Sequence, residues 1–371
     1  MHKIAIIHFS PIELYPPAMN FLNYIGEQMD DQISVRVFSM APQNQKLFQP
    51  SSNLIRTTRI GQANKSSAAS RYLNYLKFYS VTTGKLISWK PSAVVYFESL
   101  SAFPAIFYKR NVNSGCKLFI HYHEYTSPLE YQNGMLLNRW QHQLEKKIYS
   151  VANWVSHTNE DRMNLFTEDN KNVSIPNRFL LPNYPPRNWY RKQKNSEPGR
   201  PVKIVYIGAL SLETMFVKEF AEWVSKNKSD ITWDIYSSNI TDDTRAYLEA
   251  QTNSPIRYHE GVDYFSLPQI LSSYDVGVVL YKGHIPNYVY NAPNKLFEYL
   301  ACGLDVWFPV HMKSALPFLT TDTFPQVKAF DFNKLNEIDL PCAVERKNLQ
   351  FRPSSFFCED VYVNLFDRIK N

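Results

Sequence analysis

The segment from Asn291 to Gly303 reads Asn-Ala-Pro-Asn-Lys-Leu-Phe-Glu-Tyr-Leu-Ala-Cys-Gly and predicts a short helix with two marked ends. Asn291 can serve as the N-cap, Pro293 suits the first turn because it lacks an N–H, and Gly303 can end the helix in the left-handed conformation. Apolar residues recur at helical spacing: Leu296, Phe297, Leu300 and Ala301. The opposite side carries Asn294, Lys295, Glu298 and Cys302. The pattern therefore predicts a helix with one buried face and one polar, ligand-binding face centred on Glu298.

A short apolar run follows this helix at Val306, Trp307 and Phe308. Such a run is typical of a buried strand in a parallel sheet, so we expect the helix to lie between two strands of that sheet. Ligands of these sheets bind at the strand ends and at helix N-termini. The polar face of the helix is thus expected near a ligand.

The segment resembles the nucleotide-sugar-binding helix of GT-B glycosyltransferases, in particular retaining glycosyltransferase family 4 (group 1). That family shows the pattern Pro-Asn-Lys-Leu-x-Glu-Tyr-x-Ala-x-Gly, in which the glutamate grips the ribose hydroxyls of the donor. The resemblance assigns this role to Glu298, and each charge-assisted hydrogen bond from the diol would contribute roughly 1.5 to 3 kcal/mol. The alternative is that Glu298 only pairs with Lys295 on an exposed helix face.

The chain has 371 residues, which favours two domains. Short apolar strands alternate with amphipathic helices, as in doubly wound α/β domains. The expected strands are 3–8, 33–38, 93–97, 117–121, 154–157, 203–207, 233–236, 256–258 and 276–280. A proline-rich, charged stretch places the boundary between about 185 and 201. We therefore predict an acceptor-side domain at 1–190, a donor-binding domain at 201–353, and a terminal helix at 354–371 that packs on either domain. The resemblance implies two facing Rossmann-like domains with a cleft between them.

Composition narrows the expected partners and compartment. The formal charge of +6 and the pI of 8.9 favour attraction to phosphate groups or to an anionic membrane over binding of nucleic acid. No apolar run reaches the length of a membrane span, and the chain begins with a strand where a signal peptide would stand. We expect a cytoplasmic protein, with reduced thiols because the cysteines lie far apart: Cys116, Cys302, Cys342 and Cys358.

The stretch from Arg71 to Lys90 predicts a basic, aromatic helix. Such a helix can lie on the inner face of a membrane, with its cations toward lipid phosphates and its rings at the headgroup level. Alternatively, it packs on the sheet through Tyr72, Tyr75 and Tyr79. The sequence leaves both interpretations open.

The end of the strand at 117–121 carries His121-Tyr-His123-Glu124. Reacting groups of parallel sheets are placed at such ends. In the related transferases a histidine here contacts the transferred sugar, which the resemblance carries over to His123. Glu124 beside it could bond sugar hydroxyls or steady a positive, oxocarbenium-like centre. The alternative is that a histidine caps the strand and Glu124 pairs with a nearby base.

The donor's diphosphate needs positive charge, and here the sequence departs from the family. Where the related enzymes have Gly-Arg-Leu, this chain has Gly208 followed by Ala209. The remaining candidates are the backbone amides from Gly208 onward, Lys218, Lys282 and Lys295, of which Lys295 shares its helix face with Glu298.

Two further loops complete the expected donor site. The loop with Gly261 resembles the one that reads the nucleobase. The glutamate that the retaining family has eight residues before Glu298 is replaced by Tyr290, so Asn287 or Asn291 is left to meet the sugar.

These observations predict a glycosyltransferase that moves a hexosyl group from a nucleotide sugar to a glycan or lipid-linked acceptor, in surface polysaccharide or glycoconjugate synthesis. We expect no cofactor and no metal, because the family offsets the diphosphate charge with cations and a helix dipole. Retention of configuration is favoured over inversion. Two alternatives remain: a sugar-nucleotide epimerase of the same fold, and a non-catalytic partner of another transferase.

Overall fold

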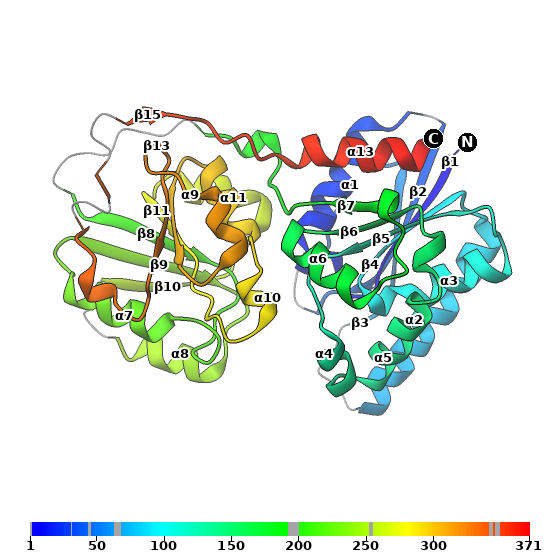
Figure 1. Cartoon of the computed structure of the whole chain (residues 1–371), viewed down its shortest axis with the longest axis horizontal. Coiled ribbons are helices and arrows are strands. Elements are labelled where there is room, and N and C mark those ends of the chain that lie inside the picture. The colour runs from blue at the N-terminus through cyan, green and yellow to red at the C-terminus, as the bar shows by residue number, and fades with distance from the viewer. Residues whose placement is uncertain are drawn as a thin grey trace. The chain divides into compact units, whose positions relative to one another are not determined.

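The computed structural model describes residues 2–30, 32–43, 46–62, 68–191, 200–251, 255–340, 344–345 and 349–371. The chain divides into two compact units (Figure 1). The first unit comprises residues 1–183 and 358–371, and the second comprises residues 184–357.

The first unit is built on a seven-stranded sheet in the order β3-β2-β1-β4-β5-β6-β7, in which all neighbours are parallel. The strands are β1 (His2–His8), β2 (Ile33–Ala41), β3 (Ile55–Gln62), β4 (Ala93–Phe97), β5 (Lys117–Tyr122), β6 (Trp154–His157) and β7 (Arg178–Leu180). The chain starts in the middle of the sheet and leaves it in both directions, so the strand order reverses between β1 and β4.

Helices cover both faces of this sheet. They are α1 (Pro16–Gln28), α2 (Ala68–Trp89), α3 (Ala102–Asn111), α4 (Pro128–Asn133), α5 (Leu136–Glu145), α6 (Glu160–Asp169) and α13 (Cys358–Lys370). Figure 1 shows α1 beside α13, and α2, α3 and α5 grouped together elsewhere on the unit. Apolar side chains of the strands and of α2 and α3 form the core under the second group.

The second unit repeats the plan with a six-stranded parallel sheet in the order β10-β9-β8-β11-β12-β14. Its strands are β8 (Val202–Ile207), β9 (Ile231–Ser237), β10 (Ile256–Glu260), β11 (Val276–Val278), β12 (Asp305–Pro309) and β14 (Val327–Phe330). Its helices are α7 (Val217–Lys226), α8 (Asp242–Glu249), α9 (Leu267–Leu271), α10 (Pro286–Val289) and α11 (Asn294–Ala301). A two-stranded pair, β13 (Thr323–Phe324) and β15 (Gln350–Phe351), lies apart from the main sheet. Here the strand order reverses between β8 and β11, and both sheets show the predicted doubly wound α/β class.

Several local predictions need correction. The polar stretch from 41 to 65 contains β3, which the sequence did not predict. This strand lies at the edge of the sheet, so it is only partly buried and carries many polar side chains. The terminal helix begins at Cys358, so neither Ser354 nor Ser355 caps it. Cys116, Cys302 and Cys358 are buried free thiols, whereas Cys342 lies outside the described residues.

The boundaries between the two units lie at 183/184 and 357/358, whereas the predicted domains ended at 190 and 353. Trp189 is buried in the core of the second unit, and Tyr184 packs against that core. The second unit therefore begins before the proline-rich stretch ends, while 192–199 of the predicted linker lie outside the described residues. The predicted cleft between the domains stays a prediction.

The terminal helix α13 belongs to the first unit, where it packs on α1. Tyr362 is the centre of this contact, because its ring lies 5.1 Å from that of Phe21 and its hydroxyl donates to the Pro17 carbonyl oxygen over 2.9 Å. Leu365, Phe366 and Ile369 are buried beside it. The sequence left two partners open for this helix, and the contacts choose α1.

Replacing Tyr362 by alanine should destabilise the first unit by about 3 to 5 kcal/mol, because it removes a fully buried ring. Tyr362→Phe should cost only about 1 kcal/mol, the net value of one hydrogen bond. Hydrogen exchange in peptides from α1 measures this loss, and peptides from α11 in the second unit are the internal control. A Val363→Ala protein, altered at an exposed position of the same helix, should match the wild type. Unchanged exchange in α1 with Tyr362→Ala would contradict the packing role.

Candidate functional site

Both sheets reverse their strand order at one point, and the predicted site residues gather there. In open α/β sheets, the carboxyl ends of the two strands at a reversal form a crevice that binds ligands, because the connections leave toward opposite faces. The first unit has this point between β1 and β4, and the second has it between β8 and β11.

In the second unit, α11 begins at Asn294 close to the reversal. Its N-cap is Pro293, which makes no side-chain cap hydrogen bond, so the prediction that Asn291 caps the helix is wrong. The proline fixes the extended backbone that enters the helix, and Asn291 lies in the preceding loop. Gly303 has φ +78°, which confirms its left-handed conformation after the helix end.

Lys295 extends from the first turn of α11 to the end of β8. Its Nζ donates to the Tyr281 hydroxyl over 3.2 Å and lies 5.6 Å from the centre of the Tyr206 ring. A Cβ built at Gly208 would stand 2.7 Å from Lys295 Cε and would displace the lysine from this path, and the φ of +133° at Gly208 also favours glycine. Burial alone would lower the pKa of Lys295, but Tyr281, Tyr206 and Glu298 raise it above its ordinary value, and the group stays a cation.

Glu298 lies one turn further along α11 and is only 7% exposed. The alternative of an ion pair on an exposed helix face is therefore wrong. Burial raises the pKa of Glu298 to about 7, although Lys295 and a hydrogen bond from Tyr264 lower it. A buried carboxylate of this kind gains from a ligand that brings hydrogen-bond donors, because they restore the solvation that burial removed.

Two other predicted donor-binding residues, Lys282 and Gly261, have different surroundings. Lys282 donates to the Leu212 carbonyl oxygen over 3.0 Å and lies 3.4 Å from a Glu219 carboxylate oxygen, so its charge is already balanced by Glu219. Gly261 follows β10, and a Cβ there would stand 2.7 Å from the Ser238 backbone nitrogen. The structure thus brings Gly208, Lys295 and Glu298 together, while Lys282 secures the loop after β8.

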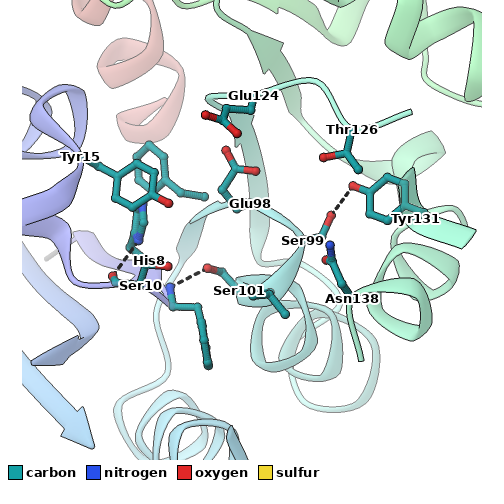
Figure 2. A pocket seen from close by; sticks show the side chains of 13 residues that line it. His8, Ser10, Tyr15, Glu98, Ser99, Ser101, Glu124, Thr126, Tyr131 and Asn138 are labelled. Carbon is teal, nitrogen blue, oxygen red and sulfur yellow. Dashed lines mark hydrogen bonds between the residues drawn. The ribbon is translucent and has the colours of Figure 1, made fainter. Parts of the chain in front are cut away.

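The first unit has a pocket of about 160 Å³ at its own reversal, between the ends of β1, β4 and β5. Figure 2 shows its polar side chains, which converge from these three strand ends and from the helices that follow. The lining residues are His8, Phe9, Ser10, Tyr15, Phe97, Glu98, Ser99, Leu100, Ser101, Glu124, Thr126, Tyr131 and Asn138.

Glu98 is the carboxylate of this pocket that was not predicted from the sequence. It directly follows β4 with φ +62° and ψ 152°, a conformation that non-glycine residues rarely adopt and that stores strain. Its Oε1 accepts a hydrogen bond from the His123 backbone N–H over 2.6 Å. Burial, followed by the nearby Glu124, raises the pKa of Glu98 to about 8. The signal that could have found it is a carboxylate at a strand end, as Glu124 is after β5.

The two predicted catalytic residues, Glu124 and His123, differ in their access to the pocket. Glu124 is exposed and lines the pocket, where Figure 2 shows its carboxyl group next to that of Glu98. The His123 ring is buried and stacks on Phe97 at 5.3 Å and on Tyr15 at 5.2 Å. Burial, followed by the neighbouring histidines, lowers the pKa of His123 well below its usual range, so the ring is neutral. The pocket is therefore walled by Glu98 and Glu124, with His123 packed behind it.

Two searches of the described residues bear on metals and membranes. Among the side chains given in the described ranges, no group of three or more His, Cys, Asp or Glu residues is placed to hold a metal ion. Across the same ranges, no helix is both long enough and apolar enough to span a bilayer.

Replacing Glu98 by glutamine should change how stability depends on pH. The Glu98 pKa is about 8 in the folded protein and about 4.5 in the unfolded chain, so folding favours the protonated form and the contribution of Glu98 to wild-type stability falls as pH rises from 4.5 through 8. Glutamine does not titrate, so Glu98→Gln should gain stability relative to the wild type by at least about 1 kcal/mol across this range. Urea unfolding of both proteins measures the difference, in which the buried histidines cancel. A difference that stays flat with pH would contradict a protonated Glu98.

Neither a protein-family model nor a curated protein sequence matches this chain. Solved structures do resemble it. The lipopolysaccharide outer core galactosyltransferase WaaB, in its apo form, is 12% identical over 99% of this chain and 95% of WaaB, with a TM-score of 0.59. Anabaena HepE in complex with UDP and glucose is 11% identical over 100% and 97%, with a TM-score of 0.59. The UDP-GlcNAc 2-epimerase from Neisseria meningitidis, bound to UDP-GlcNAc, is 13% identical over 100% of both chains, with a TM-score of 0.60.

At these identities the likeness concerns the fold. It confirms the prediction of two Rossmann-like α/β domains, whereas membership of the retaining family 4 stays a prediction. The chain has the GT-B type of fold that these transferases and epimerases share.

Proposed function

We propose that this protein is a glycosyltransferase that moves a hexosyl group from a nucleotide-sugar donor to a glycan or lipid-linked acceptor. The observation that carries the proposal is that a cation, Lys295, and a buried carboxylate, Glu298, lie one turn apart on α11 at the strand reversal of the second unit. A nucleoside diphosphate sugar presents both complementary groups, an anionic diphosphate and a ribose diol. Two solved structures of this fold hold UDP with glucose and UDP-GlcNAc, which supports the same ligand class here.

Each group has a distinct task in this proposal. Glu298 accepts hydrogen bonds from the two ribose hydroxyls and so fixes the nucleoside. Lys295, the Gly208 backbone and the first amides of α11, next to Asn294, stabilise the charge that develops on the departing diphosphate. The protein's own cation serves this leaving group, and we propose transfer without a metal ion. Gly261 and Asn291 lie in the loops assigned to the base and the sugar.

Retention of configuration is the finer part of the proposal and rests on the likeness of 291–303 to the retaining family. Tyr290 occupies the place of that family's second glutamate, and Lys313 Nζ lies 5.7 Å from the centre of its ring. Surface polysaccharide or glycoconjugate synthesis is proposed as the setting, because such products are built from nucleotide sugars.

A second candidate, a sugar-nucleotide epimerase, is favoured by the carboxyl pair Glu98 and Glu124. Two neighbouring carboxyl groups, of which one has a pKa near 8, form an acid and a base that can move protons on a sugar ring. One structure of the same fold is a UDP-GlcNAc 2-epimerase. The two candidates differ in product, because an epimerase changes the donor without an acceptor.

Donor binding should appear as a rise in melting temperature with one of the nucleotides UDP, GDP, CMP, dTDP or ADP, or with one of their sugars. Glu298→Gln should weaken that binding at least tenfold, since a lost charge-assisted hydrogen bond costs about 1.5 to 3 kcal/mol. Lys295→Met should weaken the binding of nucleoside diphosphates more than the binding of free nucleosides. Glu249→Gln, an exposed carboxylate on α8, is the matched control and should behave as the wild type.

The fate of the bound donor then separates the candidates. Transfer to an added glycan or lipid-linked acceptor, equal with magnesium and with EDTA, supports the proposed transferase. An isomerised donor without any acceptor shows the epimerase. A protein that no nucleotide stabilises is a non-catalytic partner, and the proposal fails.

We also propose that the first unit contacts the cytoplasmic face of a membrane. Apolar side chains are exposed on the first half of α2 and on α4 and α5, which Figure 1 shows close together: Tyr72, Leu73, Leu76, Leu129, Met135, Leu136 and Trp140. The Tyr75 hydroxyl lies 3.8 Å from Met135 Sδ and ties α2 to the start of α5. Arg71 and Lys77 are exposed on the same part of α2. Apolar side chains with neighbouring cations are typical of surfaces that bind anionic lipid.

The double substitution Leu73→Ser and Leu136→Ser should reduce binding to vesicles that contain phosphatidylglycerol by tenfold or more. Each leucine that enters the bilayer would contribute about 1.5 to 3 kcal/mol to binding. Flotation with those vesicles and with pure phosphatidylcholine measures the effect. Ile175→Ser, which removes an exposed apolar residue outside α2, α4 and α5, is the control. No flotation of the wild type at low salt would refute the membrane contact.

A further inference from the structure

We infer that the pocket of the first unit binds one sugar ring of the acceptor, and that this ring carries no negative charge. Glu98 and Glu124 hold its hydroxyl groups, and a phosphorylated or acidic sugar is rejected. The inference rests on the proposed transferase function and names the acceptor class of that enzyme.

The size and place of the pocket point to a single ring. Its volume of about 160 Å³ holds several waters but is well below the roughly 300 Å³ at which pockets for drug-sized ligands begin. It opens at the carboxyl ends of β1, β4 and β5, where a doubly wound sheet places its ligand. A long apolar chain does not fit such a site, so the lipid or glycan remainder of the acceptor lies outside it.

The charge of the wall selects against anions. Among the residues that the structure describes around this pocket, none is a lysine or an arginine. Burial lowers the pKa of His8 to about 4, so its ring is neutral near pH 7 and adds no positive charge. A phosphate or a carboxylate placed here would face the Glu124 carboxylate without a neighbouring cation, which costs free energy through like-charge repulsion and desolvation.

The remaining wall is suited to hydroxyl groups. Hydroxyl and amide side chains surround the two carboxyl groups: Ser10, Tyr15, Ser99, Ser101, Thr126, Tyr131 and Asn138. The His8 Nδ1 lies 2.8 Å from the Ser10 carbonyl oxygen, so it carries the proton and donates to that oxygen. His8 Nε2 is then an acceptor, buried and without a hydrogen-bond partner among the described residues. A wall with this excess of acceptors favours a ligand that brings several O–H donors.

Glu98 is held for this task by the backbone. Its Oε1 is fixed by the His123 N–H, while its own N–H donates to the His121 carbonyl oxygen over 3.0 Å. With a pKa near 8, Glu98 carries a proton in most molecules at neutral pH and can donate one hydrogen bond and accept others. Glu124, exposed at the rim, accepts further hydroxyls. The pair therefore matches the mixed donor and acceptor pattern of a sugar ring.

Saturation-transfer NMR on the full chain tests the inference with methyl glycosides of glucose, galactose, mannose and N-acetylglucosamine. The same experiment includes glucose 6-phosphate and methyl glucuronide as anionic probes. We expect signal from at least one neutral glycoside, none from the anionic probes, and at least a fivefold loss in Glu98→Gln. Thr126→Trp, which fills the pocket and leaves both carboxyl groups, should abolish the signal. Glu27→Gln, an exposed carboxylate on α1, should retain it.

Three outcomes overturn the inference. The first is an anionic sugar that binds as well as a neutral one. The second is the absence of any neutral signal, or a signal that Glu98→Gln and Thr126→Trp leave unchanged. The third is loss of the neutral signal when the matching nucleotide sugar is added, which would place the donor's sugar in the pocket. Nucleotide-induced stabilisation should be the same in all these variants, so failure of the acceptor pocket and failure of the donor site are read separately.

Discussion

The reversal of strand order is the constraint on which both sites depend. When a chain begins in the middle of a parallel sheet and leaves it in both directions, the connections diverge, and the carboxyl ends of two central strands are left uncovered. Each unit of this protein has one such point, at β1 and β4 and again at β8 and β11. Gly208 and Glu98 directly follow a strand at these two points, and both have positive φ.

The two reversals share this geometry and differ in charge. In the second unit Lys295 crosses Gly208 and stays a cation between two tyrosine rings. In the first unit the equivalent place holds Glu98 and Glu124, with hydroxyl groups around them. A cation in a partly buried site attracts phosphate, and a carboxyl pair favours neutral hydroxyl groups. One fold thereby offers two strand reversals of unlike charge, as the proposed transfer from an anionic donor requires.

The sequence predicted most strands of the two sheets because buried parallel strands are continuous apolar runs, as in Ala93–Phe97, whose bounds match the prediction. The sequence was a poor guide where the pattern of apolar side chains does not reflect burial or contacts in the fold. The edge strand β3 is rich in polar residues, so periodicity did not mark it. The apolar face of α13 showed that the helix is buried, but its partner α1 is distant in sequence. Glu98 stayed hidden for a third reason, since its backbone conformation and its hydrogen bond to His123 arise only when β4 and β5 pair.

Burial acts on Glu298 and Glu98 in the same direction, yet their neighbours lead to different chemistry. Lys295 and a hydrogen bond from Tyr264 stabilise the ionised form of Glu298 and so offset part of the effect of burial, and its pKa is raised only to about 7. Glu98 has Glu124 as its neighbour, and the pKa reaches about 8 although backbone N–H groups of His123 and Glu124 oppose the rise. Near neutral pH Glu298 is therefore ionised more readily than Glu98, which is mostly protonated. A vicinal diol, which donates twice, suits the first, and a sugar hydroxyl, which both donates and accepts, suits the second.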